Sequence, residues 1–98
     1  MSALPLPEIS LYTRPGCDLC DEARATLQGI LEDRAARGSA IATVQEIDIT
    51  TDTELENRYF DAIPVVEMGG RRLDLAISPA KLRRFVADGL EAATDRIA

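Results

Sequence analysis

The chain has 98 residues, of which 46% are apolar and 29% are charged, and its 17 acidic and 11 basic side chains give a net charge of −6. This length and composition suit a single globular domain over residues 1–98, with its core at about residues 8–93. No apolar run approaches the roughly 20 residues that span a bilayer. An acidic chain is also a poor partner for nucleic acid or an anionic membrane. We therefore expect no nucleic acid and no membrane as partner.

The first half of the chain predicts a strand followed by a long helix. Residues 8–13 have alternating apolar side chains and predict a short strand that is covered on both faces. After a turn over residues 14–17, residues 18–37 predict a helix with acidic side chains in its first turn and Gly38 just beyond its end. The apolar stripe of this helix consists of Ala23, Leu27, Ile30 and Leu31.

The second half predicts five shorter elements. They are a strand over 43–49, a short helix after residue 51, strands over 62–68 and 71–75, and a last helix from Pro79. Thr51 and Glu54 have the spacing of a capping box, and Gly69–Gly70 predicts a hairpin turn. Ser78–Pro79 supplies an N-cap and a first helical residue. The apolar face of the last helix consists of Leu82, Phe85, Val86 and Leu90.

The element order is therefore βαβαββα, which predicts an α/β fold. The first half should form a right-handed parallel βαβ unit, and the second half should add an antiparallel hairpin and a closing helix. The result is a four-stranded mixed sheet flanked by three helices. The strand at 8–13 should be internal, whereas the charged strand at 71–75 suits an exposed edge.

The only two cysteines, Cys17 and Cys20, lie where the first predicted strand gives way to the helix. A Cys-x-x-Cys pair at such a junction is typical of a thioredoxin-like redox motif. Free N–H groups and the positive end of the helix dipole favour an anion there, so Cys17 is expected to be the attacking thiolate. Cys20 lies one turn later on the same face and can break a mixed disulfide formed by Cys17.

Two other interpretations of the cysteine pair are weaker. A zinc site needs two further ligands, and the chain has no other cysteine and no histidine. Two inert core thiols are the other interpretation, but the pair follows Pro15–Gly16 and precedes Asp21 and Glu22, which is unusual for a core position. We therefore expect no metal site and no cofactor within one chain.

The stretch from Leu11 to Ala23, with Cys17-Asp18-Leu19-Cys20, resembles the glutaredoxin branch of the thioredoxin superfamily when it is taken together with Ile63-Pro64. It looks most like the small glutaredoxin-like proteins, and the resemblance covers roughly residues 8–90. It implies a thioredoxin-like fold and thiol–disulfide oxidoreductase activity. Cys17 would be the nucleophile, Cys20 the resolving thiol, and the two would form the redox disulfide.

The resemblance also implies a binding role for Ile63 and Pro64. Pro64 is expected to be cis and to lie beside the disulfide, and the backbone of Ile63 is expected to pair with an extended substrate segment. Arg14 stands close to the motif and is expected to hold a carboxylate of the substrate. The implied substrate-binding residues are therefore Arg14, Ile63 and Pro64.

Two departures from typical glutaredoxins concern the electron donor. Asp18 and Leu19 stand between the cysteines in place of Pro and Tyr. Glutathione-binding relatives have a Gly-Gly plus acidic turn after the fourth strand, whereas residues 74–79 contain no glycine and Gly69–Gly70 precedes that strand. We therefore expect weak glutathione binding, with a flavoenzyme of the thioredoxin-reductase type or a protein dithiol as the better donor.

The first turn of the helix is crowded with acidic residues. Asp18, Asp21 and Glu22 disfavour a nearby thiolate, while Arg14 and the helix end favour it. We expect the pKa of Cys17 to be lower than that of a free thiol, but less so than in a strongly oxidising enzyme.

Our first hypothesis is a monomeric cytoplasmic enzyme that reduces or exchanges disulfides in a protein or small thiol, with a reductase or glutathione as electron donor. The cytoplasm is expected because the N-terminus has no basic region typical of a signal peptide, and a dithiol there is typically catalytic. The second is a module in which two chains pool Cys17 and Cys20 around a metal or an iron–sulfur cluster. The third is a redox-inert adaptor, against which the intact pair argues.

Overall fold

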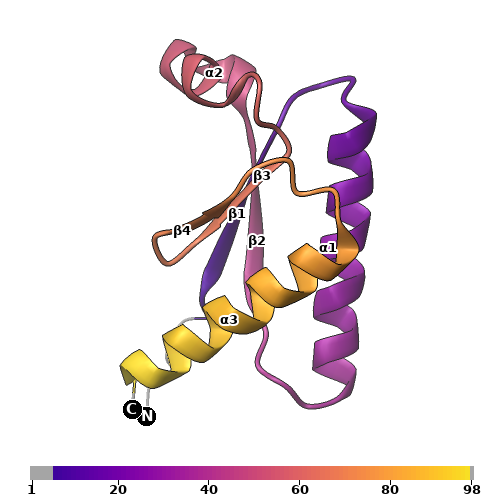
Figure 1. The fold of residues 1–98 in the computed structure, drawn as a ribbon, viewed down its shortest axis with the longest axis vertical. Coiled ribbons are helices and arrows are strands. Elements are labelled where there is room, and N and C mark those ends of the chain that lie inside the picture. Colours follow the sequence, from indigo (N-terminus) through magenta and orange to yellow (C-terminus); the bar gives the residue numbers. More distant parts are fainter. Residues whose placement is uncertain (1–5, 98) are drawn as a thin grey trace.

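Four strands form one mixed sheet in the computed structural model, which describes residues 6–97 (Figure 1). They are β1 (Glu8–Thr13), β2 (Thr43–Asp48), β3 (Val65–Met68) and β4 (Arg71–Leu73). Their order is β2-β1-β3-β4, with β1 parallel to β2, β3 antiparallel to β1, and β4 antiparallel to β3. The predicted α/β fold is confirmed, with its first strand internal and β4 at an edge. Residues 1–5, which precede the predicted core, lie outside the described residues.

The helices of the described chain follow the predicted order. They are α1 (Asp18–Ala36), α2 (Thr53–Tyr59) and α3 (Pro79–Ile97), with a short 3-10 helix, η1 (Ile49–Thr51), between β2 and α2. As predicted, Ser78 caps α3: its hydroxyl oxygen accepts the Lys81 N–H at 3.2 Å. Within residues 6–97, no helix combines the length and the apolar character needed to cross a membrane.

The start of α2 differs from the prediction. The sequence predicts Thr51 as its N-cap, but the N-cap is Asp52, whose carboxylate accepts the Glu54 N–H at 2.8 Å. Thr51 instead ends η1, where its hydroxyl donates to the Asp48 carbonyl at 2.8 Å. The predicted capping box is therefore wrong, because a 3-10 turn after β2 moves the start of α2 along the chain.

Strands β3 and β4 are shorter than predicted. β3 begins late because the N–H groups of Ala62 and Ile63 both donate to the Tyr59 carbonyl at the end of α2, at 2.9 and 3.2 Å. β4 ends early because Leu75 has a positive φ of 47°, which turns the chain towards α3. A bulky side chain rarely adopts this backbone conformation, so nothing in the sequence predicted the turn.

The main core lies between the sheet and helices α1 and α3. Ile9 and Leu11 of β1 and Val66 of β3 point into it and are 0% exposed. The helices contribute the side chains of Leu27, Ile30 and Leu31 from α1 and of Leu82, Phe85, Val86 and Leu90 from α3. The apolar faces predicted for both helices are thus confirmed.

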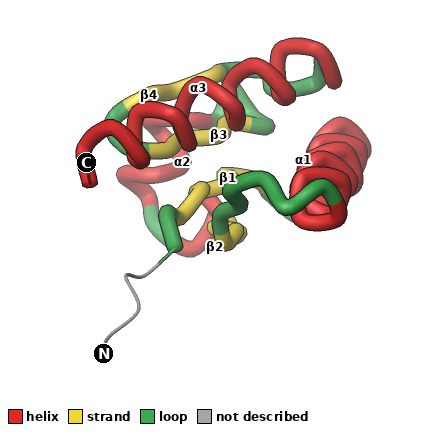
Figure 2. The backbone as a smooth tube through the Cα atoms, turned by 90° about the horizontal axis from the view of Figure 1, so that it is seen from below, coloured by secondary structure: helices red, strands yellow, loops and turns green. Residues whose placement is uncertain are grey.

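A smaller cluster covers the opposite face of the sheet beneath α2, and Figure 2 shows α1 and α2 on opposite sides of the strands. Tyr12 of β1 stacks on Tyr59 of α2, with ring centroids 4.2 Å apart. Both hydroxyls donate to the Glu67 carboxylate, from Tyr59 at 2.7 Å and from Tyr12 at 3.3 Å. Strand β1 is therefore covered on both faces, as its sequence pattern predicts.

The environment of Tyr59 makes the stability of this cluster depend on pH. Burial, followed by the hydrogen bond to Glu67, raises the pKa of Tyr59 to about 12. A tyrosine in the unfolded chain ionises near pH 10, as a rough value. Because the folded pKa is the higher one, this contribution to stability is fully present below about pH 10 and is lost as the pH rises towards about 12.

We predict that the free energy of unfolding falls by about 2 kcal/mol more in the wild-type protein than in Tyr59→Phe between about pH 10 and pH 12. Phenylalanine keeps the ring stacking on Tyr12 but has no proton to lose. Urea denaturation of both proteins across this pH range measures the difference. Parallel pH profiles for the two proteins would contradict the prediction.

Candidate functional site

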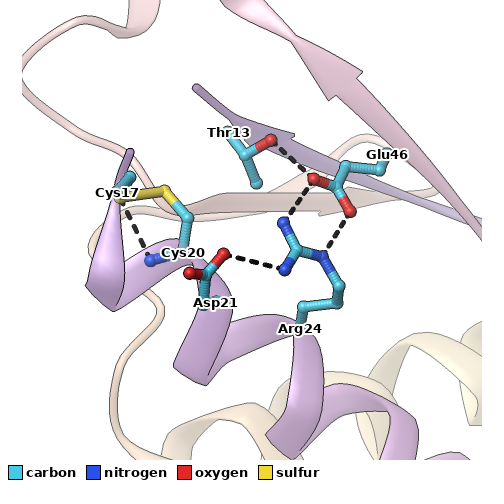
Figure 3. Close-up of a disulfide and its surroundings, with 6 residues drawn as sticks. All are labelled: Thr13, Cys17, Cys20, Asp21, Arg24 and Glu46. Atoms are coloured by element: carbon cyan, nitrogen blue, oxygen red, sulfur yellow. Dashed lines mark hydrogen bonds and ion pairs between the residues drawn. A yellow bond between two sulfur atoms is a disulfide. The ribbon is translucent and has the colours of Figure 1, made fainter. Parts of the chain in front are cut away.

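A disulfide joins Cys17 and Cys20 at the start of α1, with their Cα atoms 5.2 Å apart (Figure 3). β1 ends at Thr13, and the short connection to the helix turns at Gly16, whose φ of 75° suits glycine. Cys17 is the N-cap residue of α1 and has an extended backbone, with φ −100° and ψ 103°. The structure thus brings the two predicted cysteines together at the strand–helix junction.

The two cysteines differ in exposure and in contacts. Cys20 is 0% exposed, whereas Cys17 is half-buried. The Cys17 Sγ atom accepts the Cys20 N–H at 3.1 Å. A backbone N–H at a helix start stabilises a thiolate more than a neutral thiol. The geometry therefore favours Cys17 as the anionic and reachable sulfur once the disulfide is reduced.

An ion-pair network lies beside the disulfide (Figure 3). Arg24, in the second turn of α1, binds the Glu46 carboxylate of β2 through two hydrogen bonds, from Nε and Nη2, both at 2.6 Å. Its Nη1 atom lies 2.9 Å from Asp21 Oδ1. Thr13, which is 3% exposed, donates its hydroxyl to Glu46 at 2.9 Å. The network ties the end of β1 and the middle of β2 to the first turns of α1.

The charges of this network shift the pKa values of its members. The hydrogen bond from Arg24, helped by that from Thr13, holds the pKa of Glu46 below its usual value despite some burial. Hydrogen bonds to Glu46 and then Asp21 raise the pKa of Arg24. Arg24 and Glu46 are therefore charged at neutral pH, and the formal charges of Arg24, Glu46 and Asp21 sum to −1.

Sequence reasoning did not identify Arg24 or Glu46. The spacing of Asp21 and Arg24 on one helix face was a visible signal for one contact. The other contact depends on strand register: Leu11 pairs with Glu46, which places Glu46 two residues before Asp48, the partner of Thr13 at the end of β1. Predicting two parallel strands does not by itself predict that register.

Arg14 stays at the surface of the connection between β1 and α1. It lines a small polar cleft of about 160 Å³, together with Arg24, Glu46 and Asp48. Among the described residues, Arg14 has no ion-pair partner. Its charge is therefore available at the edge of the site.

The peptide bond between Ile63 and Pro64 is cis, and it lies directly before β3. Because Tyr12 of β1 pairs with Val65 of β3, Pro64 lies at the same end of the sheet as the connection leading to Cys17. The Ile63 N–H is engaged by the Tyr59 carbonyl at 3.2 Å. Within residues 6–97, no backbone N–H donates to the Ile63 carbonyl. Of the two backbone polar groups of Ile63, the carbonyl is therefore the one that can still accept a hydrogen bond.

The connection between β4 and α3 borders Pro64. The Leu75 N–H donates to the Ala62 carbonyl and the Ala76 N–H to the Pro64 carbonyl, both at 2.8 Å. The Ile77 N–H donates to the Leu75 carbonyl at 2.7 Å. Three backbone donors of this connection, the N–H groups of Leu75, Ala76 and Ile77, are therefore engaged within the protein. Among the described residues, no group of three or more His, Cys, Asp or Glu side chains is arranged to hold a metal ion.

Residues 8–92 match the family model of the Glutaredoxin-like domain (DUF836). The chain belongs to this family. The resemblance inferred from the cysteine motif and Ile63-Pro64 is confirmed over almost the same range of residues.

Solved structures agree with this membership. The crystal structure of protein XcR50 from X. campestris is 30% identical, with a TM-score of 0.64, over 82% of this chain and 96% of that one. The solution structure of protein Ne2328 from Nitrosomonas europaea is 19% identical, with a TM-score of 0.64, over 88% of this chain and 98% of that one. The germline-specific thioredoxin Deadhead from Drosophila melanogaster is 24% identical, with a TM-score of 0.57, over 85% and 80% of the two chains. The last two show the thioredoxin-like fold alone.

We predict that alkylation of this glutaredoxin-like protein, after reduction, labels Cys17 roughly tenfold faster than Cys20 near neutral pH, because Cys17 is the less buried of the two and its sulfur accepts a helix N–H. Mass spectrometry of peptides after brief treatment with iodoacetamide gives the two rates. Faster labelling of Cys20 would reverse the assignment of attacking and resolving thiols.

Proposed function

We propose that this glutaredoxin-like protein is a thiol–disulfide oxidoreductase whose redox pair is Cys17 and Cys20. The observation that carries the proposal is the disulfide at the start of α1, between a half-buried N-cap cysteine and a fully buried partner. An exposed sulfur can meet a substrate, and a buried sulfur one turn away can only resolve what the first has bound. Membership in a glutaredoxin-like family supports the same class of chemistry.

The proposed reaction passes two electrons from the cysteine pair to a substrate disulfide. The Cys17 thiolate attacks one substrate sulfur, a bond forms between these two atoms, and the other substrate sulfur leaves as a thiolate that takes up a proton. Cys20 then loses its proton and attacks Cys17 Sγ. The Cys17–Cys20 bond forms, and the second substrate sulfur leaves as a thiolate. An external dithiol must then reduce the pair again.

The neighbouring backbone supports binding of an extended substrate segment. The carbonyl of Ile63 has no backbone donor among the described residues and can accept a substrate N–H. Because the Ile63 N–H already donates to the Tyr59 carbonyl, we propose that Ile63 pairs with the substrate through its carbonyl alone. Arg14, exposed beside the site, can hold a substrate carboxylate.

The connection between β4 and α3 supports a donor other than glutathione. The expectation of weak glutathione binding rested in part on the lack of glycine there, yet Leu75 supplies a positive φ without glycine. The stronger argument is that the N–H groups of Leu75, Ala76 and Ile77 are all bonded to protein carbonyls. These N–H groups therefore do not form a binding site for a carboxylate of glutathione. We propose that a reductase flavoenzyme or a protein dithiol is the better electron donor.

The cellular location, the substrates and the oligomeric state are also part of the proposal. A dithiol enzyme of this kind suits the reducing cytoplasm, where a cysteine pair is typically catalytic. Its substrates would be disulfides in a protein or small thiol, and it would act as a monomer. The two alternatives, a cluster shared by two chains and a redox-inert adaptor, both predict no turnover by the isolated chain, so a turnover assay separates them from the proposal.

We predict that reduced thioredoxin or a thioredoxin-reductase-type flavoenzyme reduces the oxidised protein at least about tenfold faster than glutathione at equal reducing power. The rate of thiol appearance on Cys17 and Cys20 measures both reactions. Efficient reduction by glutathione that saturates at low concentration would contradict the proposed donor and restore a conventional glutaredoxin.

Two cysteine variants test the proposed roles with the same disulfide substrate. Cys20→Ser should still attack and should accumulate a mixed disulfide on Cys17, which mass spectrometry detects. Cys17→Ser should form no such adduct and should lose turnover. A Cys17→Ser protein with wild-type turnover would overturn the proposed function itself.

A further inference from the structure

Arg24 is the cation that links the acidic start of α1 to β2. Its guanidinium binds Glu46 with two hydrogen bonds at 2.6 Å and Asp21 at 2.9 Å. Asp21 directly follows Cys20, and its backbone N–H donates to the Cys17 carbonyl at 3.1 Å. In Figure 3 the Asp21 carboxylate is turned towards Arg24, between the disulfide and β2. One side chain therefore holds both carboxylates of the network.

The charged groups at this end of the molecule are mostly acidic. They are Asp18, Asp21, Glu22 and Arg24 on α1, Arg14 on the connection before it, and Glu46 and Asp48 on β2. The segments around Pro64, residues 62–65 and 75–77, contain no ionisable side chain themselves but directly follow Asp61 and Asp74. Among the charged groups named on α1, β2 and the connection before α1, Arg24 is one of two cations set against five carboxylates, and it is the one that pairs with two of them.

We propose that Arg24 is a positioning residue for the redox pair: it holds Asp21 and Glu46 in one ion-pair network and so determines how strongly the Cys17 thiolate is favoured over the thiol. This inference rests on the proposed function, because it concerns the same cysteine pair. Arg24 does not touch the disulfide and takes no part in electron transfer. It acts on Cys17 through the local electrostatic potential and through the placement of Asp21.

The sign of the effect follows from the charges. The network carries −1 when Arg24 is present and −2 when it is replaced by a neutral residue, and added negative charge destabilises a thiolate. Arg24 and Cys17 are seven helix positions apart, which is roughly 10 Å along the axis. At this distance in a largely solvated site, one charge shifts a pKa by about half a unit at low salt.

Global stability should depend little on the network. Its members are partly exposed, with Arg24 at 43% and Glu46 at 38% of their side-chain surface. Exposed ion pairs contribute little to folding, although a bidentate pair such as that of Arg24 with Glu46 contributes more than most. A change in thiol acidity can therefore be measured in variants that remain folded.

We predict opposite shifts for the two halves of the ion pair. Arg24→Gln should raise the pKa of Cys17 by about half a unit, and Glu46→Gln should lower it by about the same amount. The double variant has the wild-type net charge and should return close to the wild-type value. The pH dependence of iodoacetamide alkylation gives the pKa of Cys17 in the wild-type protein, the two single variants and the double variant. The shifts in pKa should become smaller at high salt.

Arg37→Gln is the matched control. Arg37 pairs with Asp33 at 3.0 Å at the far end of α1, so its loss removes the same charge from the same helix away from the cysteines. It should leave the pKa of Cys17 unchanged. Arg24→Lys keeps the charge and should preserve most of the wild-type value even if the bidentate geometry is lost.

Three outcomes would overturn the inference. The first is an unchanged Cys17 pKa in folded Arg24→Gln, and the second is a pKa shift of the same sign in Arg24→Gln and Glu46→Gln. The third is a double variant whose Cys17 pKa lies further from the wild-type value than that of either single variant. Because the pKa is measured without a substrate, these outcomes are distinguishable from failure of the proposed function, which shows as absent turnover in the wild-type protein.

Discussion

The burial of β1 on both faces is the constraint on which the rest of this structure depends. Ile9 and Leu11 anchor the strand in the core beneath α1 and α3, while Tyr12 stacks against Tyr59 on the other side. Pairing with β2 and β3 leaves this strand no freedom to shift, because a slip of one residue would exchange the two faces. The end of β1 therefore has a defined position, and the chain reaches the start of α1 with Cys17 as its N-cap.

The site built on this position balances two electrostatic effects. The helix start and the Cys20 N–H favour a thiolate on Cys17, whereas the acidic first turn opposes it. Arg24 weakens the effect of these negative charges on the Cys17 thiolate by pairing with carboxylates on both α1 and β2. This arrangement should lower the pKa of the Cys17 thiol only moderately, which is compatible with the proposed disulfide exchange.

Periodic patterns and the cysteine motif were enough to predict the element order, the internal first strand and the strand–helix junction at Cys17. Features that depend on contacts between distant segments could not be predicted in this way. The Glu46–Arg24 pair requires the register of β2 against β1, and the cap of α2 moved to Asp52 because η1 follows β2. Leu75 adopts a conformation that sequence rules reserve for glycine, held by the hydrogen bonds of its own and the next N–H to residues 62 and 64.

The central claim is that Cys17 and Cys20 form a redox couple that cycles, and the most direct test is the reduction potential of the pair. Equilibration of the protein with dithiol buffers of known potential, followed by quantification of oxidised and reduced forms, gives this value. We expect reversible two-electron behaviour at roughly −180 to −270 mV, the span from protein disulfide isomerase to thioredoxin. A potential below about −300 mV, typical of structural disulfides, or irreversible behaviour would contradict it.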